Sequence, residues 1–304
     1  MFDPFLWLAP LAVLPIVAAF GFVGCTPFST AEPPVPPTPT PAPTPKTYPE
    51  MISATPNLVA YWRLSEGAVA DVVAKDSGPN KKDGEYKNPV GVTRSVLGAL
   101  SLGPDAGDLA AEFDGTQGYV EIPFDPLINP QVYFSLELWV RPPDNPIARH
   151  VIAGAYELDG TGKLLHGYVL DHIPGTPPKF RIRLGTNNVA APVALAFDYG
   201  DGLDFDKWRH IVVVYDGSIS TLSAYVNCKD GKPVATIASM PGKPVVLQGN
   251  QTSLTRLGVG FDEKPHPAPV LGFFYKGRID EVALYNGALS GATVQAHFKK
   301  ATAL

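Results

Sequence analysis

Two acidic residues stand side by side in an otherwise apolar stretch near the end of the chain. Asp280 and Glu281 belong to the segment RIDEVALY, residues 278–285, whose alternation is typical of a strand. On such a strand Asp280 shares a face with Val282 and Leu284, and we expect this face to be buried. A carboxylate on a buried apolar face is unfavourable unless it is paired, hydrogen-bonded or bound to a metal. Asp280 is therefore expected to have such a partner.

A second acidic segment, FDYGDGLDFDKW at residues 197–208, contains four aspartates. Their spacing does not match the EF-hand loop, so a solvated loop is the expected structure. Tyr199 and Phe205 interleave with the acids and could stack on a sugar ring, although anchoring the loop to the core is the commoner role of such aromatics. The candidate ligand-binding residues of this loop are Tyr199, Asp201, Asp204 and Phe205.

Composition narrows the class of protein. The chain has 304 residues, of which 45% are hydrophobic, as in ordinary globular proteins. The formal net charge of -5 is spread along the chain and gives no basic footprint for nucleic acid or anionic lipid. Of the two cysteines, Cys25 lies at the end of the leader and Cys228 lies deep in the domain, so an internal disulfide framework is not expected. We expect Cys228 to be a buried thiol, and the six scattered histidines do not suggest a zinc site.

The elements that must position these residues are short strands. From residue 58 onward, short apolar alternations are separated by Gly, Pro, Asn and Asp. In FSLELWVR, residues 134–141, the even-numbered residues are apolar, which indicates a half-buried strand. Asp-Gly pairs at 216–217 and 230–231 predict hairpin turns. Strands are expected at 58–64, 110–122 (two), 134–141, 166–173, 180–185, 208–217, 220–227 and 255–261.

The last segment, SGATVQAHFKK, is the one fair helix of this region. Ser290 can cap its N-terminus, and Val294, Ala296 and Phe298 are expected to face the body. Many short strands with almost no helix predict an all-β fold, a two-sheet antiparallel β-sandwich or jelly roll.

The N-terminal part of the sequence predicts that the protein is exported. Residues 5–25 carry no charge and form either a signal-peptide core or a membrane-spanning helix. The tetrapeptide FVGC resembles the lipobox of bacterial lipoproteins, in which Cys25 would be lipidated; the alternative is an uncleaved hydrophobic anchor helix. Residues 26–56 are rich in proline and threonine and predict a disordered, extended linker. The expected organisation is a leader or anchor at 1–25, a linker at 26–56 and a sandwich domain at 57–300.

Five segments carry a family resemblance. They occur in the order LVAYWRLSEG with DSGPNKKDGEY, FDGTQGYVEIP, FSLELWVRP, WRHIVVVYDG and GRIDEVALYNGALSGATV. With them the chain resembles the laminin G-like branch of the concanavalin A-like lectin/glucanase superfamily. The resemblance implies two antiparallel sheets packed face to face, with the first and last strands adjacent.

The resemblance also implies a structural Ca²⁺ site. In this family the Asp of IDEV helps to bind the ion together with a DSSGN-like loop, which here matches DSGPN at residues 76–80. Ca²⁺ is coordinated by six to eight oxygens, which such a loop can supply. The alternative is that Asp280 caps N–H groups and that the first Asp of the loop forms an Asx-turn. The implied ligands are Asp76, Ser77, Asn80 and Asp280.

Because the superfamily contains glucanases, catalysis must be considered. Retaining glycosidases need two carboxylates about 5–5.5 Å apart. The nearest candidates are Glu157 with Asp159, in a turn-like segment, and Asp280 with Glu281, which are adjacent and should lie on opposite strand faces. Neither pair places two acids on one face, so we predict no catalytic residues.

The sequence therefore favours an exported, non-catalytic, surface-displayed binding module for a glycan or a surface protein. We expect the protein to contact the membrane only through its N-terminal anchor or lipid. The alternatives are a structural surface, appendage or virion protein that uses the sandwich for protein contacts and, ranked lowest, a glycoside hydrolase. Recognition is expected in loops. The candidate loops are residues 142–149, 157–163, 198–206 and 262–272.

Overall fold

The computed structural model divides the chain into two compact units, residues 1–43 and 44–304. The residues that it describes all belong to the second unit; they are 47–67, 72–101, 103, 105–129, 132–143, 146–186, 192–200, 202, 204–238 and 254–303. The predicted leader, the lipidation candidate Cys25 and the linker as far as residue 46 lie outside the described residues. No helix in the described ranges is long and apolar enough to cross a bilayer.

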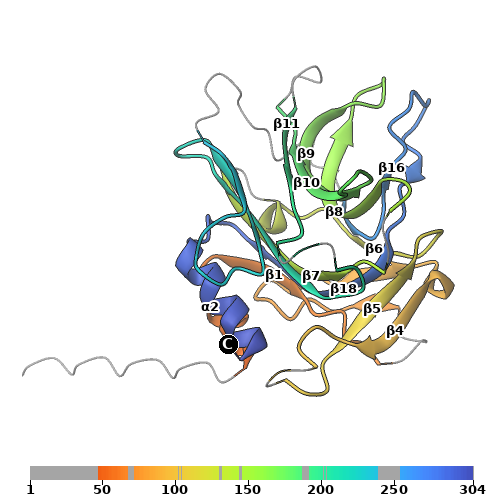
Figure 1. The fold of residues 1–304 in the computed structure, drawn as a ribbon. Coiled ribbons are helices and arrows are strands. Elements are labelled where there is room, and N and C mark those ends of the chain that lie inside the picture. The colour runs from red at the N-terminus through yellow and green to blue at the C-terminus, as the bar shows by residue number, and fades with distance from the viewer. Residues whose placement is uncertain are drawn as a thin grey trace, which may run out of the picture. The chain divides into compact units, whose positions relative to one another are not determined.

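Two antiparallel sheets pack face to face, as predicted (Figure 1). Sheet A has the order β14-β13-β12-β7-β18-β5-β4, with β1 also paired to β18, and sheet B has the order β11-β10-β9-β8-β15-β6-β3-β2. The sheet A strands are β1 (Leu58–Trp62), β4 (Val92–Leu97), β5 (Leu109–Asp114), β7 (Tyr133–Arg141), β12 (Arg209–Asp216), β13 (Thr221–Val226), β14 (Ala235–Ile237) and β18 (Lys276–Tyr285).

Sheet B and the smaller elements complete the sandwich. The sheet B strands are β2 (Val73–Ala74), β3 (Gly84–Lys87), β6 (Tyr119–Ile122), β8 (His150–Leu158), β9 (Leu164–Ile173), β10 (Lys179–Leu184), β11 (Val193–Phe197) and β15 (Thr255–Leu257). The remaining elements are the hairpin β16 (Gly260–Phe261) with β17 (Leu271–Gly272), the helices α1 (Tyr48–Ala54) and α2 (Gly291–Thr302), and the short 3₁₀ turns η1 (Pro89–Gly91) and η2 (Pro126–Ile128). The predicted adjacency of the first and last strands is confirmed by the antiparallel pairing of β1 with β18.

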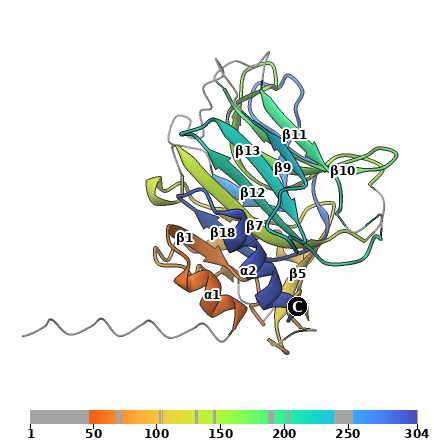
Figure 2. The same ribbon diagram turned by 60° about the vertical axis from the view of Figure 1, so that its left-hand side comes forward.

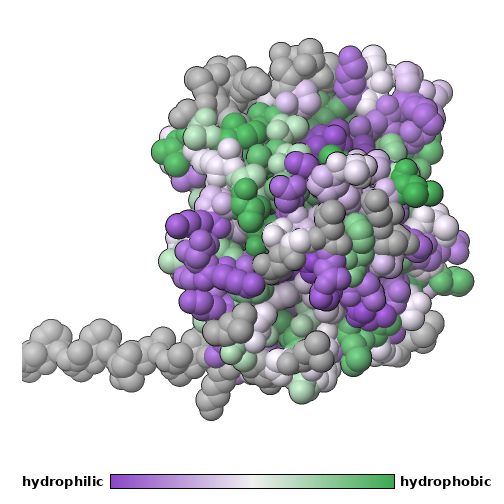
Figure 3. Space-filling view, in the orientation of Figure 1, coloured by the Kyte–Doolittle hydropathy of each residue, from purple (hydrophilic) through white to green (hydrophobic). Residues whose placement is uncertain are grey.

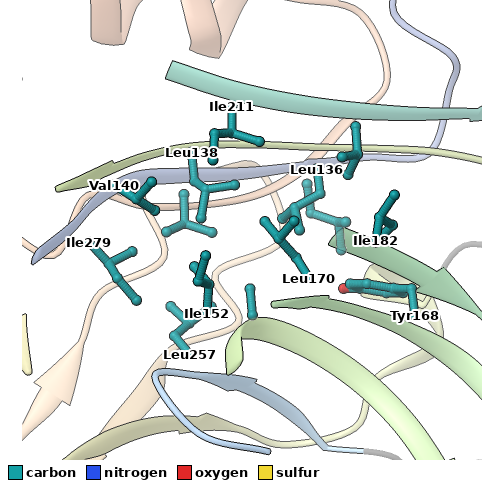
Figure 4. Packing of buried hydrophobic residues seen from close by; sticks show 14 of the residues in the cluster. Leu136, Leu138, Val140, Ile152, Tyr168, Leu170, Ile182, Ile211, Leu257 and Ile279 are labelled. Atoms are coloured by element: carbon teal, nitrogen blue, oxygen red, sulfur yellow. The ribbon is translucent and has the colours of Figure 1, made fainter. Parts of the chain in front are cut away.

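The core lies between the two sheets. Leu136, Leu138 and Val140 of β7 point from sheet A toward Ile152 and Leu170 of sheet B (Figure 4). These five side chains are at most 2% exposed. Each buried side chain of this size contributes about 1.5–3 kcal/mol of hydrophobic stabilisation relative to its exposed state. The period-two pattern of the sequence therefore identifies the inner face of β7 correctly.

The outer face of β7 is also buried, unlike a half-buried strand. Ser135, Glu137 and Trp139 are each at most 3% exposed. The reason is that α1 and α2 lie over this side of sheet A (Figure 2). The polar residues of this alternating strand therefore face the two helices and not solvent.

Helix α1 lies inside the range predicted to be linker. Thr47 is its N-cap and forms a capping box with Glu50, and Tyr48 and Ile52 are fully buried. Within the described residues, folded structure is therefore present before residue 57, the predicted start of the domain. The proline-rich composition hid this helix, although the sequence TYPE contains the capping signal and proline within the first turn.

Helix α2 is where the sequence places it. The Ser290 side chain accepts a hydrogen bond from the Thr293 N–H at 3.1 Å, and Val294 and Phe298 are buried as expected. Ala296 is exposed, so its predicted inward orientation is wrong, and His297 is buried instead. The 3.6-residue period explains this, because a residue two positions after Val294 points to the opposite side of the helix.

Candidate functional site

A β-bulge in β18 changes the position of the adjacent acids. Asp280 pairs with Trp139, but the next paired residue, Ala283, is opposite Glu137, so two residues of β18 face the single residue between these partners. Glu281 has a φ of 52°, in the left-handed region. Alternation is therefore interrupted, and both acids lie in one buried group. The prediction that Asp280 and Glu281 occupy opposite faces is wrong for this reason.

The acid group consists of Asp108, Asp280 and Glu281. Their carboxylates each offer an oxygen within 4.8 Å of the others, and all three residues are buried. Arg63 reaches the group from its partly exposed position, with Nε 2.8 Å from Glu281 and Nη2 3.0 Å from Asp108. The Ala99 N–H donates to Asp280 Oδ2 at 2.7 Å. One guanidinium thus faces three carboxyl groups.

The electrostatics of the acid group favour a further cation or a bound proton. Burial raises the pKa of Asp280 well above its usual range, and the Asp108 carboxylate raises it further. Burial likewise raises the pKa of Glu281. Asp280 Oδ1 and Glu281 Oε2 have no hydrogen-bond partner among the described residues. Three carboxylates with two unpartnered oxygens form a donor set that suits a hard divalent cation such as Ca²⁺.

The loop predicted to share this site is held by hydrogen bonds to the backbone. Asp76 Oδ1 accepts from the N–H groups of Tyr61 and Gly78 at 2.8 and 2.7 Å, and its Oδ2 accepts from Lys82 N–H at 2.7 Å. Asn80 donates to the carbonyl of Val59 at 2.7 Å. Asp76 therefore forms an Asx-turn and ties its loop to β1. Of the four implied ligands Asp76, Ser77, Asn80 and Asp280, the last alone belongs to the acid group.

Sequence reasoning missed Asp108 and Glu281 as members of this group. Asp108 directly precedes β5, and its carboxylate also accepts from the Leu100 N–H at 3.0 Å. Nothing in its spacing indicates that it meets β18. The available signal is that two acids are adjacent in a strand, because a β-bulge can direct both side chains to the same side.

Beside the acid group, a groove of about 470 Å³ opens between α2 and sheet A. Trp139, Trp208 and Phe298 line it, and the rings of Trp139 and Phe298 are stacked with centroids 6.1 Å apart. Its polar lining is Arg141, Asp206 and Lys207, with Asn227. Ala99 joins the groove to the acid group, because it lines the groove and hydrogen-bonds to Asp280. An apolar hollow with a few convergent polar groups is the usual form of a small-molecule site.

The acidic loop contributes to the groove through residues other than those predicted. Tyr199 is 1% exposed and bonds to His172 within the core, and Phe205 packs edge-on against it with centroids 5.7 Å apart. These aromatics therefore anchor the loop, which is the alternative role considered for them. Asp204 pairs with Lys207. Asp201 lies outside the described residues. The groove residues of this loop are Asp206, Lys207 and Trp208.

A buried carboxylate holds the wall of the groove in place. Glu137 Oε1 lies 2.9 Å from the Tyr48 hydroxyl and 2.8 Å from His210 Nε2. Its Oε2 lies 3.0 Å from the Tyr285 hydroxyl and 3.0 Å from His297 Nδ1. Burial acts to raise the pKa of Glu137, but the charges and hydrogen bonds of the two histidines outweigh it and hold this pKa well below its usual range. Glu137 thus connects α1, β12, β18 and α2.

The other predicted recognition loops have structural contacts. Arg149 at the end of the 142–149 segment pairs with Asp171 at 2.5 Å and with Glu263 at 2.7 Å, so it meets the 262–272 segment, which contains β17. In the 157–163 turn, Asp159 accepts hydrogen bonds from its own turn. Cys228 is buried, as predicted, and burial raises the pKa of its thiol.

Comparison with known proteins identifies a fold family. The profile described as the concanavalin A-like lectin/glucanases superfamily, in its laminin G branch, matches residues 114–295, more than half of the chain. No curated protein sequence matches the chain.

Solved structures with a similar fold include several toxin domains. The binding domain of botulinum neurotoxin serotype G is 13% identical, covers 80% of this chain and 50% of that chain, and has a TM-score of 0.56. The binding domain of Paraclostridial Mosquitocidal Protein 1 is 17% identical, with 80% and 52% covered and a TM-score of 0.54. The ligand binding domain of botulinum neurotoxin serotype D in complex with N-acetylneuraminic acid is 12% identical, with 80% and 50% covered and a TM-score of 0.56. The chain spans about half the length of these structures, and identities this low bear on the fold alone.

Proposed function

This chain belongs to the concanavalin A-like lectin/glucanase superfamily, and from that premise we propose that it is a non-catalytic module that binds carbohydrate in the groove beside α2. The observation that carries the proposal is the aromatic lining of this groove with charged groups at its edge. Its volume of about 470 Å³ lies within the roughly 300–1,000 Å³ of small-molecule sites.

The chemistry of the lining suits a sugar. The faces of pyranose rings are apolar and the ring edges carry hydroxyl groups, so an aromatic platform beside hydrogen-bonding side chains complements both. Trp208 is half-buried and presents an amphipathic ring, and Arg141 and Asp206 supply a donor and an acceptor. The serotype D neurotoxin domain, which shares the fold, forms a complex with N-acetylneuraminic acid, and this supports a glycan as the ligand class here.

Two arrangements of acids support a role without catalysis. Asp280 and Glu281 are fully buried, so their carboxyl groups are not accessible to a substrate. Asp159 is engaged by the N–H groups of its own turn, and Glu157 lies 3.0 Å from His166. Retaining hydrolysis needs an accessible pair of carboxylates.

We also propose that the acid group holds a structural Ca²⁺. Asp108, Asp280 and Glu281 would supply carboxylate oxygens, and the ion would compensate their charge. The bound ion would tie the segment preceding β5 to β18. The unpartnered oxygens of Asp280 and Glu281 support this proposal.

The proposed setting is the cell exterior. The uncharged segment at residues 5–25, with Cys25 as a lipidation candidate, and the proline-rich residues after it support export and display of the module on a surface. A glycan or a glycosylated surface protein is then the accessible partner. The alternative, a structural appendage protein, would call for a large apolar contact surface. On the face seen in Figure 3, hydrophobic residues are interspersed with hydrophilic ones.

A glycan array with the purified protein and its Trp208→Ala variant tests the proposal. We expect saturable binding to a set of glycans and at least about tenfold weaker binding by the variant, because the stacking surface is lost. Tyr133→Ala is the matched control, since Tyr133 is 37% exposed and lies at the opposite end of β7 from the groove. Absence of saturable binding to any glycan refutes the proposed function, and release of reducing sugar would indicate a hydrolase.

A further inference from the structure

We infer that the ligand of the groove is an acidic sugar whose carboxylate is bound by the guanidinium of Arg141. The inference rests on the proposed carbohydrate-binding function and narrows its ligand class. The observation behind it is the guanidinium of Arg141, which lines the groove and, among the described residues, is engaged through Nε alone.

The position of Arg141 is fixed by the protein. It is the last residue of β7, and its Nε donates to the carbonyl oxygen of Asp206 at 3.1 Å and to Asp206 Oδ1 at 2.9 Å. Its two terminal amino groups have no hydrogen-bond partner within the described part of the chain. They form the parallel pair of donors that matches the two oxygens of a carboxylate. Because Asp206 already orients the side chain, little further ordering is needed when a ligand binds.

The charge balance of the groove favours an anion. The Arg141 side chain is 27% exposed, whereas its partner Asp206 is 63% exposed, so water screens the acid more than the base. Lys207 adds a second positive charge to the lining and is paired with Asp204. The guanidinium is thus the most desolvated charge of the groove edge, and an anionic ligand compensates it where a neutral sugar does not.

Trp208 places the ring of the ligand. It lines the same groove as Arg141, and its indole N–H has no partner among the residues that the structure describes. An aromatic face for the pyranose ring, an indole donor for a hydroxyl group and a guanidinium for the carboxylate form a complementary set. A uronic acid and a sialic acid both carry these features, and the test separates them.

The experiment uses pairs of glycans with and without an acidic group. Glucuronate-terminated and glucose-terminated oligosaccharides, sialylated and desialylated galactosides, and 6-sulfated galactosides are titrated against the full chain. We expect the carboxylate-bearing member of at least one pair to bind about 10- to 100-fold more tightly than its neutral counterpart, the range expected for charge-assisted hydrogen bonds.

The variants separate a paired donor from simple charge. Arg141→Lys keeps the positive charge but loses the fork, and we expect it to lose most of the preference for the acidic member of each pair while neutral-glycan binding changes little. Arg256→Ala is the matched control, because Arg256 also pairs with a carboxylate through Nε, at 3.0 Å from Glu121, but lies in sheet B. Thermal unfolding of each variant checks that the fold is kept.

Each outcome of these titrations either supports or overturns the inference. Equal binding of acidic and neutral glycans, or a preference that survives Arg141→Lys, overturns this inference while the carbohydrate-binding function stands. A preference confined to 6-sulfated glycans also overturns the carboxylate assignment. Failure of every glycan to bind refutes the proposed function and this inference together.

Discussion

Replacing Glu137 by glutamine is the most informative single change in this fold. The Glu137 carboxylate is fully buried and lies within hydrogen-bonding distance of Tyr48, His210, Tyr285 and His297. The amide removes the negative charge and replaces one acceptor oxygen by an NH₂ group that faces donors. The side-chain volume hardly changes, so the effect reports the charge and the hydrogen bonds and not a cavity.

The magnitude follows from the four contacts. Removing one partner of a buried charged network costs about 3–5 kcal/mol, because the remaining groups lose compensation while still shielded from water. We therefore expect Glu137→Gln to lower the free energy of unfolding by about 3–5 kcal/mol. For a domain of this size that corresponds to a fall in Tm of roughly 6–20 °C. Urea unfolding at pH 7 and thermal unfolding, both followed by circular dichroism, measure it.

The pH dependence has a defined sign. The pKa of Glu137 is lower in the folded state than in the unfolded chain, so its contribution is fully present above the unfolded pKa of about 4.3 and is lost progressively as pH falls from there through the lower folded pKa. The wild-type protein should therefore lose this increment on acidification, and the Glu137→Gln variant should not. The two stability curves should begin to approach each other below about pH 4 and meet only below the folded pKa of Glu137.

Two comparisons would refute the reasoning. Glu121→Gln is the control, because Glu121 is 22% exposed in its pair with Arg256 and should change stability by less than about 1 kcal/mol. If Glu137→Gln behaves like this control, the network is not a stabilising unit. If the effects of Glu137→Gln and Tyr48→Phe simply add, the hydroxyl of α1 is not coupled to the carboxylate.

Two further outcomes are expected. Saturating Ca²⁺ should raise Tm more at pH 7.5 than at pH 5. The folded-state pKa values of Asp280 and Glu281 are raised, so the metal-free fold is most stable below the unfolded pKa values and loses stability as pH rises through the folded ones. The ion binds the ionised carboxylates and should therefore restore more stability at the higher pH. Asp280→Asn should abolish the Ca²⁺-induced shift, and an unchanged Tm with EDTA together with no calcium by elemental analysis would remove the metal from the description. Gly258→Ala should cost about 2–4 kcal/mol in urea unfolding, because Gly258 has a φ of 85° and an added Cβ would lie 2.7 Å from Phe113; a change below 1 kcal/mol would show that this contact relaxes freely.

The architecture could be predicted from the sequence because strand periodicity and turn residues are local signals. The Asp-Gly pairs after β12 and β13 form turns between antiparallel neighbours, and Ser290 caps α2 as expected. The helix α1 could not be found in the same way. A seven-residue helix has little stability of its own, so its formation depends on burying Tyr48 and Ile52 against partners far along the chain.

The candidate site was predictable only in part, because it depends on tertiary contacts that no local sequence pattern indicates. The adjacent acids of β18 marked an unusual strand, but the alternation rule misassigned Glu281 because the sequence does not encode the bulge in a local pattern. In the acidic loop, the aromatics nearest to the acids were the natural candidates for sugar stacking. Tyr199 is buried and Phe205 is half-buried against the core instead, and the loop contributes Trp208, which sequence reasoning placed in the following strand, to the groove.

The network at Glu137 has a mechanical consequence. Tension applied to the chain before Thr47 enters the fold through α1, whose Tyr48 hydroxyl is held by this carboxylate. The same carboxylate holds His297 of α2, the helix that contributes Phe298 to the wall of the groove. If the groove binds a ligand as proposed, a pulling force on the N-terminal side and a load on that ligand would both act on Glu137, and ligand release would then depend on the tension in the chain.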